Sequence, residues 1–149
     1  QTGGPARGKL FELGGVVGGD FVTTVHLANF GLWQLGLLGV VLADIDEGFV
    51  RLGSAKTRGL GTVSVALDEL LVDQVGAHGA LAGVGALHAG LEPYGLIERP
   101  DLRGPTGAPA PGALGQRFVW KGNESCRAAL DEVAQTAWPS LLAQRGAAA

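Results

Sequence analysis

Apolar and polar residues alternate along two stretches near the beginning of the chain. Residues 10–17 are compatible with a strand, and residues 21–27 repeat with a period of two, which is typical of a sheet. One face of the second stretch carries Phe21, Thr23, Val25 and Leu27. Gly18 and Gly19 supply a turn between the two stretches. The pattern therefore predicts an antiparallel hairpin.

The next stretch has the period of a helix. Asn29 stands where it can cap the helix, and Gly48 stands where a left-handed residue can stop it. The apolar positions recur at steps of three and four, at Leu32, Trp33, Leu35, Leu38, Leu42 and Ile45. The acidic residues Asp44, Asp46 and Glu47 crowd the expected end, where they oppose the helix dipole.

A second strand-like pattern follows this helix. Residues 49–52 begin a short strand, and residues 62–67 alternate apolar with small or polar side chains. Between them lies a glycine-rich loop that runs from Gly53 to Gly61. The order strand, strand, helix, loop, strand indicates an α+β fold.

The rest of the chain divides into two parts. Residues 76–116 hold most of the prolines and many glycines, which is typical of an insertion or linker. In residues 117–149, Asn123 can cap a last helix, which Pro139 is expected to end or kink. The apolar stripe of this helix is Cys126, Leu130, Val133, Ala137, Trp138 and Leu141. Residues 1–9 are a flexible lead-in, and structure is expected from Leu10.

Composition limits the classes of function. A chain of 149 residues with 46% hydrophobic residues suits one domain, and its net charge of -3 means that any nucleic-acid contact must come from a local cluster of cations. A single cysteine indicates a reducing compartment. No leader or membrane span is evident, so we expect a soluble, cytoplasmic protein. The chain has no methionine, which suggests a piece of something longer.

The glycine-rich loop is the strongest candidate for chemistry. Glycines allow backbone N–H groups to approach a phosphate closely, and Arg51, Lys56 and Arg58 supply neutralising charge. The spacing matches neither the Walker loop nor the dinucleotide-binding motif, because this loop precedes a strand. A solvated turn without a ligand is an equally good interpretation of the loop's composition.

Two tracts resemble the RAMP superfamily of CRISPR-associated proteins. They are Asn29-Phe-Gly-Leu-Trp-Gln-Leu-Gly-Leu-Leu and Gly48-Phe-Val-Arg-Leu-Gly-Ser-Ala-Lys-Thr-Arg-Gly-Leu-Gly-Thr-Val63. The resemblance covers roughly residues 10–70 and is strongest for the repeated backbone subunits of type III effector complexes. It implies a loop that grips the sugar-phosphate chain of a guide RNA, formed by Arg51, Gly53, Ser54, Lys56, Thr57, Arg58, Gly59 and Gly61.

The resemblance also implies a ferredoxin-like (RRM-like) antiparallel sheet with helices on one face. Residues 10–75 supply only the last four elements of such a unit, so its first strand and helix are missing. The implied partners are guide RNA, other RAMP-type subunits or copies of this chain, and a target RNA.

Other candidate residues give weaker signals. Some family members cut RNA through an aspartate, and Asp20 is the only weak candidate here. His26 is expected on a sheet surface, and His78, His88 and Cys126 lack the spacing of metal ligands, so we expect no metal and no cofactor. Tryptophan side chains can stack on bases, but Trp33 and Trp138 are better explained as core anchors.

Three functions remain open on the sequence. The first is a subunit that binds the guide-RNA backbone. The second is an RNA endonuclease subunit of the same kind of complex, for which no catalytic residue can be matched. The third is a structural or interaction domain in which the loop is only a turn.

Overall fold

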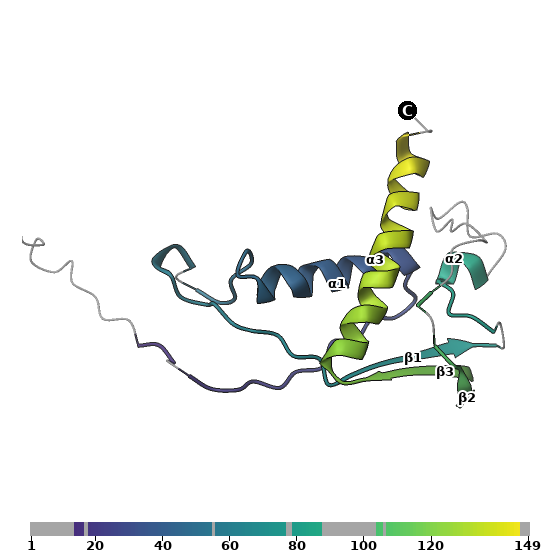
Figure 1. Cartoon of the computed structure of the whole chain (residues 1–149), viewed down its shortest axis with the longest axis horizontal. Coiled ribbons are helices and arrows are strands. Elements are labelled where there is room, and N and C mark those ends of the chain that lie inside the picture. The colour runs from purple at the N-terminus through teal and green to yellow at the C-terminus, as the bar shows by residue number, and fades with distance from the viewer. Residues whose placement is uncertain are drawn as a thin grey trace, which may run out of the picture.

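The computed structural model describes residues 14–16, 18–54, 56–76, 79–87, 104–105 and 107–146. It is an α+β structure in which a small antiparallel sheet lies against two long helices (Figure 1). The helices are α1 (Leu32–Asp46) and α3 (Asn123–Gly146), with a short α2 (Val84–Leu87) and a single 3-10 turn, η1 (Lys56–Arg58). The strands are β1 (Glu69–Val75), β2 (Ala110–Gly112) and β3 (Gly115–Lys121).

The three strands are ordered β1-β3-β2, and both pairings are antiparallel. Strand β1 pairs with β3 along its whole length, from Glu69 opposite Lys121 to Val75 opposite Gly115. Phe118 and Trp120 lie on one face of β3, and their rings stack with centroids 6.1 Å apart. The sheet therefore presents an aromatic face to the core.

The core lies between this aromatic face, α3 and the first half of α1. Helix α3 supplies a buried stripe at four of the predicted positions, Cys126, Leu130, Val133 and Ala137, and the side chains of Trp138 and Leu141 lie outside the described ones. Cys126 belongs to this stripe, is fully buried and behaves as a small hydrophobe, as predicted. The other buried apolar residues are Leu32, Leu35, Val72, Leu81, Phe118, Trp120, Ala129, Leu130, Val133 and Ala137.

Two glycines allow α1 to cross α3 closely. A Cβ atom on Gly36 would lie 2.9 Å from the Cα of Ala134, and one on Gly39 would lie 2.9 Å from the Cβ of Leu130. Both glycines are buried, so this crossing is tightly packed. Small residues at these two positions let the helix backbones approach.

Helix α1 begins and ends for local reasons. Asn29 does not cap the helix as predicted: it has a left-handed φ of 52°, and Gly31 occupies the N-cap position. The Gly31 N–H instead donates to the side-chain oxygen of Gln34, 2.8 Å away. The predicted stop is confirmed, because Gly48 has a φ of 81° just after the C-cap residue Glu47.

Several predicted strands are wrong over the described residues. Residues 14–16 and 18–27 form no hairpin, and residues 49–52 and 62–67 are not in strands. Alternation makes a strand only where another backbone pairs with it, and here the paired segments are β1, β2 and β3. Residues 10–13 and 17 lie outside the described residues.

The C-terminal half also differs from its prediction. Strand β2 and the start of β3 lie within residues 76–116, the expected linker. The last helix is confirmed, but it continues past Pro139 to Gly146 instead of ending there. A proline removes one helical hydrogen bond, and a helix of 24 residues keeps its other bonds.

Candidate nucleic-acid interface

The structure brings the eight predicted RNA-binding residues together on one exposed loop at the far end of α1 (Figure 1). Lys56, Thr57 and Arg58 form the η1 turn and are all exposed. Arg51 and Ser54 lie on the incoming side, and Arg51 is half-buried. Ala55 lies outside the described residues.

The loop is closed by a backbone neck. The Leu52 N–H donates to the Gly61 carbonyl oxygen at 2.9 Å, and the Gly61 backbone has a φ of 86°. A Cβ atom on Gly61 would overlap the carbonyl oxygen of Leu52, so only glycine fits there. Gly53 and Gly59 also have left-handed φ values, of 79° and 85°, but a Cβ on either would meet open space.

Inside the neck, further hydrogen bonds shape the loop. Arg51 Nη1 donates to the Lys56 carbonyl oxygen at 3.0 Å, and the Gly59 N–H donates to the same oxygen at 3.2 Å. The Arg51 guanidinium therefore braces the loop from within. Within the described part of the chain, the Lys56 ammonium group makes no hydrogen bond or ion pair, so its charge is directed to solvent.

Charge is concentrated on this tract. Residues 49–66 contain three cations, Arg51, Lys56 and Arg58, and no acidic residue, although the whole chain has a net charge of -3. By contrast, Arg117, Lys121 and Arg127 are each paired with a carboxylate. In sequence, residues 49–66 are therefore a tract of cations with no acidic residue among them.

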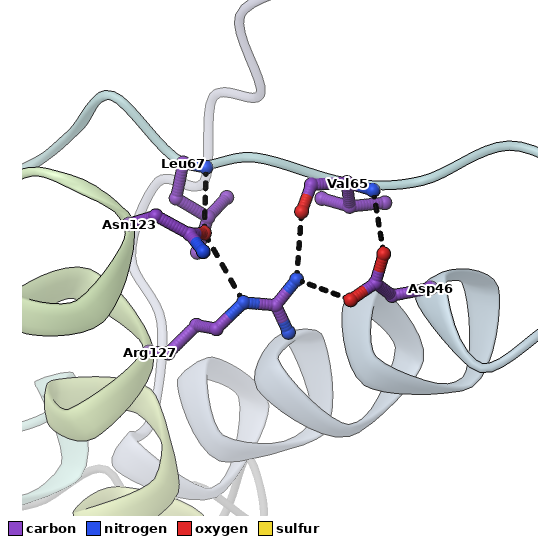
Figure 2. A network of polar contacts seen from close by, with 5 residues as sticks. All are labelled: Asp46, Val65, Leu67, Asn123 and Arg127. Carbon is purple, nitrogen blue, oxygen red and sulfur yellow. Dashed lines mark hydrogen bonds and ion pairs between the residues drawn. The ribbon is translucent and has the colours of Figure 1, made fainter.

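A polar network fixes the segment that leaves the loop (Figure 2). Asp46, at the end of α1, accepts a hydrogen bond from the Val65 N–H at 2.8 Å and pairs with Arg127 Nη2 at 2.9 Å. Arg127 also donates to the Val65 carbonyl oxygen at 2.7 Å. Asn123 accepts from the Leu67 N–H at 3.0 Å and from Arg127 Nε at 3.1 Å.

Sequence reasoning missed this network. Its one signal was the cluster of acidic residues at the end of α1, which is unfavourable for the helix dipole. The position of Asp46 is explained by its two partners, the Val65 N–H and Arg127. Asn123, which the sequence predicts as the cap of its own helix, accepts a hydrogen bond from the Leu67 N–H. The network ties the loop's outgoing segment to both long helices.

The remaining candidates do not assemble into a second site. Asp20 and His26 are both exposed on the extended segment before α1. Among the described residues, no three His, Cys, Asp or Glu side chains are grouped as metal ligands. His78 and His88 lie outside the described residues. No described helix has the length and apolar character needed to cross a bilayer.

These features define an α+β protein with a braced, exposed basic loop. Comparison with known proteins finds no matching family model, no matching curated protein and no matching solved structure.

Proposed function

We propose that this chain is a subunit that binds the sugar-phosphate backbone of a guide RNA through residues 51–61, as its resemblance to the RAMP superfamily implies. The proposal includes the ferredoxin-like relationship and a role in a CRISPR effector complex of antiviral defence. One observation carries it: an exposed tract of three cations and no acidic residue, residues 49–66, is held in shape by the backbone hydrogen bond between Leu52 and Gly61.

The geometry suits phosphate better than a base. Lys56 and Arg58 lie on the same short turn, between the left-handed Gly53 and Gly61. Their cationic side chains can bind phosphate oxygens without reading sequence. Within this tract, no aromatic side chain accompanies the cations beyond Phe49, so base stacking does not add to the argument.

The test compares two exposed lysines. Lys56→Ala removes a cation from the loop, and Lys121→Ala removes one from β3. The Lys121 side chain is 75% exposed, and its Nζ lies 3.6 Å from Oε2 of Glu69 in a long ion pair. Binding is measured by fluorescence anisotropy of a labelled, mixed-sequence single-stranded RNA between about 50 and 200 mM salt. Melting curves confirm that each variant folds.

We expect a loop-specific loss of affinity. Each lost phosphate contact lowers the salt slope by about 0.7, which is about 5-fold in affinity at 0.1 M salt. Lys56→Ala should therefore lose about 5-fold and Lys56→Ala/Arg58→Ala about 25-fold. Lys121→Ala should bind as wild type does. Absence of binding by wild type, or equal losses at Lys56 and Lys121, contradicts the proposal.

A further inference from the structure

The basic loop is attached to the last turn of α1 at both of its ends. On the incoming side, the Val50 N–H donates to the Asp44 carbonyl oxygen at 3.0 Å. On the outgoing side, the Val65 N–H donates to Asp46 Oδ1 at 2.8 Å. Asp44 and Asp46 belong to the same helical turn, so these bonds hold the two ends of the loop close together.

A side chain on α3 secures the outgoing end. Arg127 Nη2 lies 2.9 Å from Asp46 Oδ2 and donates to the Val65 carbonyl oxygen at 2.7 Å (Figure 2). Arg127 Nε donates to Asn123 Oδ1 at 3.1 Å, which fixes the direction of the guanidinium. Because only 26% of the Arg127 side chain is exposed, solvent screens these contacts less than it screens a pair in open water. Arg127 therefore joins the end of α1 to the outgoing segment.

Closure of the neck depends on how these ends are held. The Leu52–Gly61 hydrogen bond lies a few residues inside the two attached ends. A single backbone hydrogen bond contributes little by itself, and a glycine-rich loop gains conformational freedom when it opens. Fixing the two ends of a loop removes part of that freedom before the neck forms. The contacts of Arg127 should therefore keep the neck closed from a distance.

We propose that Arg127 is a positioning residue for the basic loop: by holding the outgoing end on α1, it keeps residues 51–61 in the closed shape that binds phosphates. Its guanidinium is engaged by Asp46, Val65 and Asn123 and takes no part in the phosphate contacts. The effect on binding rests on the RNA-binding function proposed above, whereas closure of the neck is a property of the chain without RNA. Helix α3 thereby controls a site to which it contributes no ligand-binding residue.

Amide hydrogen exchange measured by NMR tests closure of the neck without RNA. The Leu52 N–H reports on the neck, and the amides of β1 and β3 in the same spectra report on the stability of the core. Arg127→Met is compared with Arg117→Met, which removes the same charge. The Arg117 guanidinium donates to Asp73 at 2.7 and 2.8 Å on the sheet, well away from the loop in Figure 1.

We expect the Leu52 N–H to exchange about 10-fold faster in Arg127→Met than in wild type, because the outgoing end loses its hydrogen bond and ion pair to α3. In Arg117→Met it should exchange at the wild-type rate. Arg127→Lys should be intermediate, since lysine keeps the charge but lacks the planar set of donors.

RNA anisotropy measures the consequence for binding. Arg127→Met should bind about 2- to 5-fold more weakly than Arg117→Met, because a smaller fraction of its chains has a closed neck. Both variants lack one cation outside the loop and keep Arg51, Lys56 and Arg58, so their salt slopes should equal that of wild type. A loss of affinity without a loss of salt slope is the signature of positioning, since a lost phosphate contact lowers both.

Two results overturn the proposal. The first is a rate of Leu52 exchange that is unchanged in a folded Arg127→Met variant or raised equally in Arg117→Met. The second is an Arg127→Met variant whose neck opens but whose RNA affinity equals that of Arg117→Met. If Arg127→Met does not fold, Arg127→Lys is compared with Arg117→Lys, and equal Leu52 exchange in the two contradicts the proposal. A wild-type chain that binds no RNA removes the proposed function, and the exchange rates still decide whether Arg127 positions the loop.

Discussion

Replacing Gly61 by asparagine tests whether the shape of the loop, and not its charge alone, determines binding. Gly53 is the matched control, because it has nearly the same left-handed φ but open space where a Cβ would lie. Asparagine tolerates left-handed backbone better than most residues, so the dihedral cost is similar at both positions. The two variants differ mainly in the overlap with the Leu52 carbonyl oxygen.

The magnitude follows from that overlap. A left-handed asparagine costs roughly 1 kcal/mol or less, which limits the loss of affinity in Gly53→Asn to about 5-fold. In Gly61→Asn the clashing atom belongs to backbone, so the neck must open and the Leu52–Gly61 hydrogen bond is lost, at about 1 kcal/mol more. With residual strain the total reaches about 2–3 kcal/mol, or about 30- to 140-fold in RNA affinity.

RNA anisotropy at one fixed salt concentration measures the difference, and the melting temperature checks that the core is intact. Both variants keep all three cations, so their salt slopes should resemble that of wild type while their affinities separate by about 10-fold. Equal affinities for Gly53→Asn and Gly61→Asn would refute the reasoning, because the neck would then have no part in binding.

Three further predictions concern stability. Gly36→Ala gains helix propensity of about 1 kcal/mol but places a Cβ against the backbone of Ala134, so we expect a net loss of about 1–2 kcal/mol by urea denaturation; equal or higher stability would contradict the close crossing. Arg127→Met should lower the free energy of unfolding, measured by urea denaturation, by about 1–2 kcal/mol. Arg127→Lys should lower it by less, because lysine keeps the positive charge but lacks the several N–H donors of the planar guanidinium. The hydrogen bond from Arg117 lowers the pKa of Asp73, so this pair's contribution is present above the ordinary carboxyl pKa and is lost as pH falls through the lower folded pKa; in acid titrations of unfolding, Arg117→Ala should flatten that part of the profile, and an unchanged profile would argue against the pairing.

The sequence predicts the parts of this fold that depend on near neighbours. The stop of α1 at Gly48 and the buried stripe of α3 from Cys126 to Ala137 follow from spacing within one helix, and both are confirmed. The loop is also local, because its glycines and cations are adjacent in the chain. Whether it binds RNA stays a prediction.

The sheet and the network depend on distant partners, which is why they were missed. Residues 21–27 alternate better than β1 does, yet β1 pairs with β3 and residues 21–27 pair with no described backbone. Arg127 and Asp46 are 81 residues apart, and neither residue type indicates the other. Period-two alternation indicates which side chains a strand would bury, but backbone pairing with another segment determines whether the strand forms.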